Sequence, residues 1–293
     1  MREWLKLLRV KHWLKNLLVL FPLLFSGRAV HPDALIQGIV AFLAFCFMAS
    51  AIYVVNDIRD AENDRAHPTK CLRPIASGAI STAPAIVVAC VFAVLAVVLC
   101  IPCAQQTPLA ILFLIAYAVL NIAYSFGCKN VPILDIAMLS VGFLLRILFG
   151  SAFCGIEVSS WLFLTVLSLS VFLSLGKRRG EIERFGTSAR ASLMRYDKSF
   201  LDKNMYVYLG LGLVFYSLWT FQGMDVAYLG YSIGQLALVA GIPLAMFACM
   251  RYSFCIERTA SDGDPIGVVL GDKPLLVLMI LWVVVMIIGV YMP

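Results

Sequence analysis

Long apolar stretches alternate with short polar stretches along the whole chain. Each apolar stretch holds about twenty residues, the length that a helix needs to cross a hydrocarbon core of roughly 30 Å. Little chain remains between these stretches, so we expect an all-α integral membrane protein that forms a single polytopic domain over residues 1–293. The pattern predicts nine transmembrane helices at residues 13–27, 34–57, 82–102, 108–126, 133–153, 160–178, 204–222, 229–250 and 273–291.

The composition supports a membrane protein. Of the 293 residues, 62% are hydrophobic and only 14% are charged, and the mean hydropathy is +0.93. Soluble domains have about 25% charged residues, so an ordinary globular protein is excluded. The net charge of +6 does not indicate nucleic acid, because most of the basic residues lie in polar stretches outside the apolar ones. We expect the bilayer to be a partner and nucleic acid not to be one.

The basic residues also predict the orientation. Among the basic residues in loops between predicted spans, nearly all lie in alternate loops, at 58–81, 127–132, 179–203 and 251–272, whereas the other loops contain only Arg28. Loops rich in Lys and Arg stay in the cytoplasm, and an odd number of spans places the two ends on opposite faces. We therefore expect an inner-membrane protein with a cytoplasmic N-terminus and an outer C-terminus. The basic start resembles a signal peptide, but SGRAVHPDA is a poor cleavage site, so we expect 13–27 to be a retained first span.

Three aspartates lie at the end of the second predicted span, 34–57, and just beyond it. Asp57, Asp60 and Asp64 are spaced i, i+3 and i+7, which places three carboxylates on one face of a continuous helix. Hard oxygen ligands of this kind suit Mg²⁺, which binds one or two carboxylates together with phosphate oxygens of a substrate. The plainer alternative is a solvated helix end, which explains the charge but not the alignment. We expect these aspartates to form a catalytic magnesium site.

A basic loop follows the aspartates. Lys70 and Arg73 lie in HPTKCLRPIASG, where two prolines break the helix. Lys and Arg can bind the diphosphate oxygens that a metal ion leaves unbound, although ordinary positive-inside charge is the alternative. Loops 58–81 and 179–203 are both long and charged, and we expect them to cap a common active-site cavity between helices.

The stretch NDIRDAEND, residues 56–64, resembles the NDxxDxxxD motif of the UbiA superfamily of intramembrane prenyltransferases. PIASG after Arg73 also resembles that family. The resemblance covers essentially the whole chain and implies a bundle of nine helices with Mg²⁺ as cofactor on Asp57, Asp60 and Asp64. Ordinary members have a second Asp-rich motif after the sixth helix, but here that place reads GKRRGE, residues 176–181. Lys177, Arg178 and Arg179 would replace a second metal site by a cationic one, which suits a more phosphate-rich ligand.

Further stretches narrow the resemblance to one branch of the family: RVKHWLKN (9–16), Tyr124-Ser125, Lys129, VPILD (131–135), GKRRGE and GDKP (271–274). That branch moves phosphoribose from phosphoribosyl diphosphate to a polyprenyl phosphate and releases diphosphate. The lipid phosphate is already an anion and needs no strong general base, so the protein mainly positions and neutralises its substrates. The candidate substrate-binding residues are Lys15, Asn56, Lys70, Arg73, Tyr124, Lys129, Asp135, Lys177 and Arg179.

Several alternatives stay open at this point. The basic candidates and Tyr124 could be interfacial residues without a ligand. Asp135 and Arg146 lie on nearly one face of the fifth span, and the depth of Arg146 fits a structural partner as well as a ligand contact. An ordinary prenyltransferase that joins a prenyl diphosphate to an aromatic acceptor is the second enzyme hypothesis, and a transporter is a third. A homo-oligomer is possible.

Overall fold

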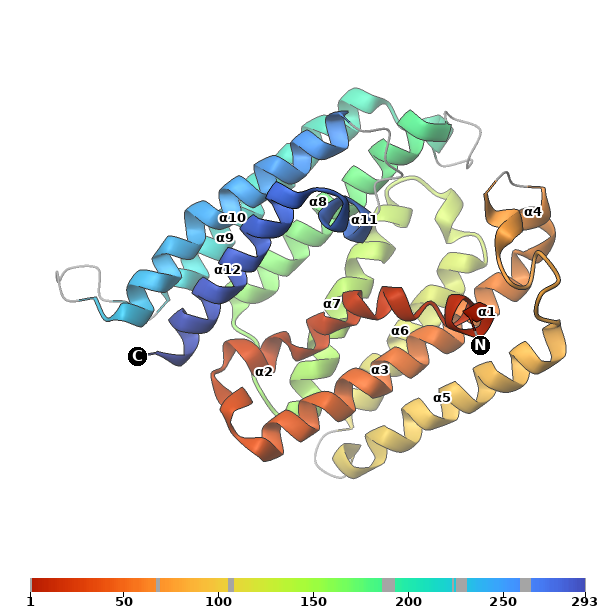
Figure 1. The fold of residues 1–293 in the computed structure, drawn as a ribbon, viewed down its shortest axis with the longest axis horizontal. Coiled ribbons are helices and arrows are strands. Elements are labelled where there is room, and N and C mark those ends of the chain that lie inside the picture. Colours follow the sequence, from red (N-terminus) through yellow and green to blue (C-terminus); the bar gives the residue numbers. More distant parts are fainter. Residues whose placement is uncertain are drawn as a thin grey trace. The chain divides into compact units, whose positions relative to one another are not determined.

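The computed structural model of the protein describes residues 2–66, 69–104, 108–185, 193–222, 224, 231–258 and 265–292, and these residues contain helices and no strand (Figure 1). Contacts divide the chain into two compact units. Unit 1 comprises Met1–Phe126 and Leu145–Glu157, and unit 2 comprises Gly127–Leu144 and Val158–Pro293. The boundary passes through helix α7, Leu134–Cys154.

Unit 1 is built around the long helix α3, which packs along α5 (Figure 1). Its elements are α1 (Arg2–Leu7), the 3-10 helix η1 (Val10–Leu20), α2 (Phe21–Phe25), η2 (Arg28–Val30), α3 (Pro32–Arg59), α4 (Ala61–Arg65), η3 (Lys70–Leu72), α5 (Thr82–Ala104), α6 (Leu109–Ser125) and the second half of α7.

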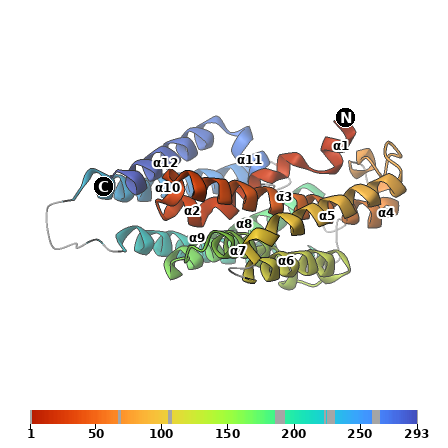
Figure 2. The same ribbon diagram turned by 90° about the horizontal axis from the view of Figure 1, so that it is seen from below.

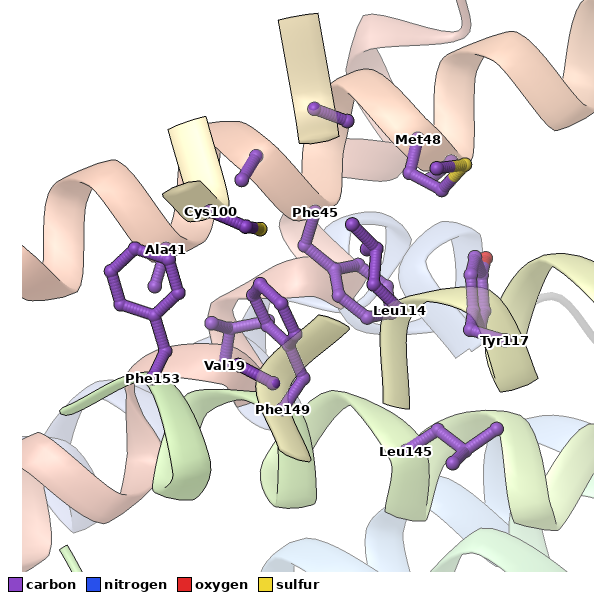
Figure 3. Close-up of a cluster of buried hydrophobic side chains, with 14 of the residues drawn as sticks. Val19, Ala41, Phe45, Met48, Cys100, Leu114, Tyr117, Leu145, Phe149 and Phe153 are labelled. Carbon is purple, nitrogen blue, oxygen red and sulfur yellow. The ribbon is translucent and has the colours of Figure 1, made fainter. Parts of the chain in front are cut away.

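Aromatic and small residues together form the core of unit 1. Phe45 of α3 lies with its ring centroid 4.5 Å from that of Tyr117 and 5.3 Å from that of Phe149. Figure 3 shows how these side chains from α3, α6 and α7 point toward one another. Close approach of the backbones also matters, because a Cβ on Gly150 of α7 would lie 1.9 Å from the carbonyl oxygen of Val19. Only glycine lets η1 lie against α7 at this point.

Unit 2 consists of two long helix pairs and shorter elements. α8 packs along α9, and α10 packs along α12, as Figure 2 also shows for α10 and α12. Its core contains Phe172, Leu175, Met205, Tyr252 and Ile256. The elements are η4 (Cys128–Asn130), the first half of α7, α8 (Ser160–Phe185), η6 (Leu193–Arg195), α9 (Lys198–Phe221), α10 (Ile233–Arg258), α11 (Pro265–Gly271) and α12 (Lys273–Tyr291).

Two helices show the surface expected of a membrane protein. Val87, Val91 and Val94 of α5 are exposed, as are Ile280 and Val284 of α12. Apolar exposed side chains on helices that carry no charged residue between their ends suit contact with lipid tails. These exposed apolar residues account for the regular apolar stretches of the sequence.

The number of spans differs from the nine predicted. Within the described residues, six helical segments are long and apolar enough to cross a membrane: Pro32–Arg65, which comprises α3 and α4, Thr82–Ile101, Leu134–Cys154, Ser160–Glu183, Ile233–Glu257 and Lys273–Tyr291. The helix at the predicted span 108–126 has 17 residues and is only a shorter apolar helix. α9, at the predicted span 204–222, has 24 residues, so its composition and not its length sets it apart from these six segments.

The predicted first span, 13–27, is wrong as a single helix. The chain there forms the 3-10 helix η1, which follows Arg9 in a left-handed conformation, and then the separate short helix α2. Pro22 stands at the start of α2, where its missing N–H costs nothing, and this position separates the two segments. A 3-10 helix has fewer residues per turn, so the α-helical period that was expected does not apply.

Candidate functional site

The acidic segment, residues 56–64, lies where α3 ends and α4 begins. α3 ends at Arg59, α4 begins at Ala61, and Asp60 between them has φ −86° and ψ 1°. The expectation of one continuous helical face therefore needs correction, because Asp60 interrupts the helix. The backbone nevertheless stays nearly helical, since the Asp60 N–H donates to the Asn56 carbonyl and the Asp64 N–H donates to the Asp60 carbonyl at 2.8 Å. Asp57 and Asp64 therefore remain close in space.

The carboxylates of Asp57 and Asp64 are buried and share one cation. Asp57 is 2% exposed and Asp64 is 4% exposed, whereas Asp60 is half-buried. Arg73 Nη1 donates to Asp64 Oδ2 at 2.6 Å and lies 3.3 Å from Asp57 Oδ1. A single cationic nitrogen thus contacts both carboxylates. We call Asp57 and Asp64 the acidic pair.

The loop that carries Arg73 is anchored by apolar side chains. Arg73 has an extended backbone, as expected for a residue before proline. Ile75 and Ile80 beyond it are buried in a cluster with Leu7 and Val54 from α1 and α3. Burial of these side chains fixes the loop against the end of α3. The guanidinium of Arg73 is therefore positioned by packing as well as by charge.

A second arginine reaches Asp57 from the N-terminal segment. Arg9 Nη2 donates to Asp57 Oδ1 at 2.6 Å, and its guanidinium carbon lies 4.7 Å from the Tyr53 ring centroid. Arg9 has φ 50° and ψ 45°, a left-handed conformation that costs a non-glycine residue about 1–2 kcal/mol. Such strain persists only where the surroundings impose it, and it is common at functional sites.

Sequence reasoning missed Arg9 as a member of this site. The sequence favours Lys15 instead, because Lys15 lies at the cytoplasmic end of the predicted span 13–27. The bond from Trp13 Nε1 to Ser50 Oγ, 3.0 Å, and the bond from Ser50 Oγ to the Leu8 carbonyl, 2.8 Å, hold the N-terminal segment on α3. The motif RVKHWLKN contains the signal, but only the fold shows that Arg9 faces Asp57. Lys15 is half-buried on η1.

The acidic pair fits a magnesium ion in its donor chemistry. Mg²⁺ takes hard oxygen ligands and uses one or two carboxylates, and the pair supplies two buried carboxylates within reach of one cation. Among the described residues, no group of three His, Cys, Asp or Glu side chains is assembled as a metal centre. The prediction that Asp57, Asp60 and Asp64 together form the magnesium site stays a prediction. Asp57 and Asp64 are the residues that would hold the ion, and the role of Asp60 stays a prediction.

Three other predicted site residues, Asn56, Tyr124 and Lys70, also lie in unit 1. Asn56 Oδ1 accepts a bond from Ser125 Oγ at 2.5 Å, which ties the acidic segment to the end of α6. Tyr124 directly precedes Ser125 and is half-buried. Lys70 is half-buried on η3, three residues before Arg73. Asn56 is therefore placed by a second helix, whereas the roles of Tyr124 and Lys70 stay predictions.

In unit 2, Asp135 belongs to a buried ion-pair network. Asp135 and Arg178 are both 0% exposed, and Arg178 Nε lies 2.7 Å from Asp135 Oδ2. Arg178 Nη1 also donates to Glu181 Oε2 at 2.5 Å. Tyr196 donates its hydroxyl to Asp135 Oδ1 at 2.6 Å and accepts from the N–H of Ile133, whose φ is 68°. Burial, together with the hydrogen bond to Asp135, raises the pKa of Tyr196, so its proton stays in place.

Arg179 is likewise held by partners inside unit 2. It is 5% exposed, and it donates to Asp202 at 2.7 Å, to Glu183 at 3.0 Å and to the Ile256 carbonyl at 3.2 Å. The stretch 177–179, expected to form a cationic site, thus directs two of its three cations to internal carboxylates. Binding of substrate by Asp135 and Arg179 stays a prediction, but their contacts are those of residues that stabilise the unit. Lys177 and Lys129 are half-buried.

Arg146 forms a separate buried polar cluster in unit 1. Its Nε donates to Asn16 Oδ1 at 2.9 Å and its Nη2 to the Tyr117 hydroxyl at 3.0 Å. The guanidinium carbon also lies 5.3 Å from the Phe45 ring centroid. These contacts join η1, α6 and α7, so they favour a structural role for Arg146 over a ligand contact.

The all-helical fold and the Asp-rich segment define a class of membrane enzyme. Residues 17–265 match the model of the UbiA prenyltransferase family, and this chain belongs to that family. The family predicted from NDIRDAEND is therefore confirmed, as is the prediction of a membrane transferase.

The most informative relatives belong to one branch. The chain is 37% identical to decaprenyl-phosphate phosphoribosyltransferase of Corynebacterium glutamicum, over 98% of this chain and 86% of that protein. It is 36% identical to the enzyme of the same name from Mycolicibacterium smegmatis, over 95% of this chain and 89% of that protein. The sequence similarity to this branch, expected from GKRRGE and the other short stretches, is confirmed.

The fold agrees with a solved structure. A UbiA homolog from Archaeoglobus fulgidus, bound to GPP and Mg²⁺, superimposes with a TM-score of 0.68 over 97% of this chain and 99% of that chain. The two sequences are 15% identical, so the likeness establishes the fold and nothing about the substrate.

Proposed function

We propose that this protein transfers 5-phosphoribose from phosphoribosyl diphosphate to a polyprenyl phosphate of the decaprenyl type, with release of diphosphate. The observation that carries the proposal is the near full-length similarity to enzymes named for this reaction. The geometry supports it, because the buried acidic pair and its two arginines suit a metal-bound diphosphate. We place the reaction at the cytoplasmic face of the inner membrane, with a cytoplasmic N-terminus and an outer C-terminus.

The reaction needs little proton transfer to or from the protein. The bond between C1 of the ribose and the diphosphate oxygen breaks, and its electron pair leaves with diphosphate. An oxygen of the lipid phosphate, already anionic, forms the new bond to C1. Mg²⁺, when bound, neutralises charge on the leaving diphosphate. The protein binds and orients the two anions and excludes water from the reacting carbon.

Residues of unit 1 divide this work. Asp57 and Asp64 would hold the metal ion, and Arg73 would bind diphosphate oxygens that the metal does not reach. Asn56 orients a polar group of the donor from its fixed position beside α6. Lys15, Lys70 and Tyr124 are proposed contacts for substrate oxygens. In the same sense we retain Lys129 and Lys177 of unit 2 as proposed contacts for anionic groups.

Prenyl transfer is the second candidate function. The family is named for prenyl transfer, and the acidic pair would suit a prenyl diphosphate as well as a phosphoribosyl diphosphate. The reaction in that case joins the prenyl group to an aromatic or other small acceptor. The stretch GKRRGE, in place of a second acidic motif, disfavours this candidate.

A donor comparison tests the proposal. Membranes that contain the protein are incubated with Mg²⁺, a polyprenyl phosphate and ribose-labelled phosphoribosyl diphosphate, and the label in the lipid fraction is counted. We expect labelled lipid, and its loss on addition of a chelator. Absence of labelled lipid from correctly folded protein, with product formed from a prenyl diphosphate and an aromatic acid, would reverse the ranking.

The matched variants are Asp57→Asn and Asp33→Asn. Both make the same substitution on α3, but Asp33 is exposed in the first turn at the opposite end of that helix. We expect Asp57→Asn to lower the rate by at least about a hundredfold, as removal of one charged group at a reacting phosphate does. Asp33→Asn should keep the wild-type rate, and equal rates of the two variants contradict the role of Asp57.

A further inference from the structure

The acidic pair is neutralised by arginines from two different segments. Arg73 Nη1 lies 2.6 Å from Asp64 Oδ2 and 3.3 Å from Asp57 Oδ1, and Arg9 Nη2 lies 2.6 Å from Asp57 Oδ1. Two carboxylates therefore face two guanidinium groups. The local charge is balanced by the chain itself.

A metal ion must compete with these arginines for the same oxygens. Arg73 Nη1 contacts both carboxylates, so it stands where a cation that bridges them would stand. Mg²⁺ binds carboxylate oxygens at about 2.0–2.1 Å, a distance that leaves no room for a guanidinium between the ion and the oxygens. The ion and the two arginines also repel one another, and more strongly where the carboxylates are buried. The metal alone should bind weakly.

A diphosphate changes this balance because it gives the arginines a new partner. Guanidinium groups bind phosphate oxygens with two parallel hydrogen bonds, at least as well as they bind carboxylates. The side chain of Arg73 is 29% exposed and that of Arg9 is 22% exposed, so neither is enclosed by protein. Arg73 can therefore turn from the carboxylates to a diphosphate that arrives with the metal.

We propose that Arg9 and Arg73 are resident counter-cations of the acidic pair, which make the metal ion and the diphosphate bind together and only weakly apart. The inference rests on the proposed function of this pair as a metal and diphosphate site. The strained backbone of Arg9 fits this role, because it holds the guanidinium on Asp57 from outside the loop that carries Arg73. Coupling of this kind is reciprocal, so each ligand raises the affinity for the other by the same factor.

Metal binding, measured without any turnover, tests the proposal. Mn²⁺ takes oxygen ligands as Mg²⁺ does, and electron paramagnetic resonance counts the free ion directly. The purified protein in detergent is titrated with Mn²⁺ alone and with inorganic diphosphate present. A titration without protein corrects for the Mn²⁺–diphosphate complex in solution. The variants are Arg73→Gln and Arg9→Gln.

Arg59→Gln is the matched control. Arg59 lies within the same acidic segment, but its guanidinium carbon is 3.9 Å from the Phe126 ring centroid instead of on a carboxylate of the pair. The control loses the same positive charge near the site. It therefore separates the direct ion pairs from a general change of local charge.

We expect diphosphate to tighten Mn²⁺ binding to the wild type by about tenfold or more, the usual size of such coupling. In Arg73→Gln and in Arg9→Gln, Mn²⁺ alone should bind about tenfold more tightly, and diphosphate should add little. Arg59→Gln should behave as the wild type. An increase in metal affinity also proves that the variant is folded, because an unfolded site would lose the metal.

Failure of the proposed metal site and failure of the counter-cation proposal give different results. If the wild type binds no more Mn²⁺ than Asp57→Asn, with or without diphosphate, the acidic pair is not the metal site and the proposed function loses its metal. If the wild type binds Mn²⁺ through Asp57 but neither arginine variant binds Mn²⁺ alone more tightly than Arg59→Gln, the counter-cation proposal is overturned. Weaker metal binding in both variants overturns it as well.

Discussion

The buried ion pair of unit 2 gives a prediction that burial alone decides. Asp135→Asn removes one carboxylate from Arg178, which is 0% exposed, and leaves its ion pair with Glu181. Removal of one member of a buried pair costs about 3–5 kcal/mol, because the other charge stays buried. Glu181 offsets part of this cost, so we expect a loss of about 3 kcal/mol in the free energy of unfolding.

Asp202→Asn is the comparison for this prediction. Asp202 pairs with Arg179 at 2.7 Å, the residue next to Arg178, but its side chain is 31% exposed and Arg179 keeps Glu183. Water screens such a pair, and we expect a loss of at most about 1 kcal/mol. The two variants make the same substitution opposite neighbouring arginines. They differ mainly in burial.

Unfolding by SDS in mixed micelles, followed by circular dichroism, measures both variants against the wild type. A double variant, Asp135→Asn with Arg178→Gln, closes a thermodynamic cycle and should recover about 1–3 kcal/mol relative to the sum of the single changes. Equal losses for Asp135→Asn and Asp202→Asn would refute the reasoning from burial. Transferase activity of Asp135→Asn at temperatures where it stays folded tests the separate prediction that Asp135 binds substrate.

Three further predictions concern stability. Tyr196→Phe removes the hydroxyl that bonds Asp135 and should cost about 1–3 kcal/mol in the same SDS titration. Gly150→Ala places a Cβ 1.9 Å from the Val19 carbonyl oxygen and should cost about 1–3 kcal/mol, with no gain from helix propensity. The ion pair with Arg251 holds the pKa of Asp272 well below its ordinary value of 3.8. The stability that this pair contributes is therefore present above pH 3.8 and is lost as the pH falls below it. Asp272→Asn should flatten the acid limb of a pH–stability curve.

Local patterns predicted most of the helices. Apart from the first, each predicted span coincides with a helix within the described residues, for example 82–102 with α5 and 273–291 with α12. Hydrophobic length is a property of neighbouring residues, so it can be seen without the fold. The first span failed because its apolar composition does not reveal a 3-10 helix followed by a separate turn of helix at Pro22.

The candidate site divides in the same way. The motif at Asp57, Asp60 and Asp64 indicated a metal and diphosphate site, because hard ligands at short spacing are visible in sequence. The partners of these acids were visible only in part. Arg73 was predicted, whereas Arg9, separated from Asp57 by 48 residues, was not.

The sequence by itself determined that this is a helical membrane protein of the UbiA family, with acids at one helix end and cations in the loops. These properties depend on composition, apolar length and short motifs, which are local. The tertiary structure decided which charges meet: Arg73 lies between the two carboxylates of the acidic pair, and Arg178 is paired with Asp135 inside unit 2. The reason is physical, because a buried charge must find a counter-charge wherever the packing of helices brings one near.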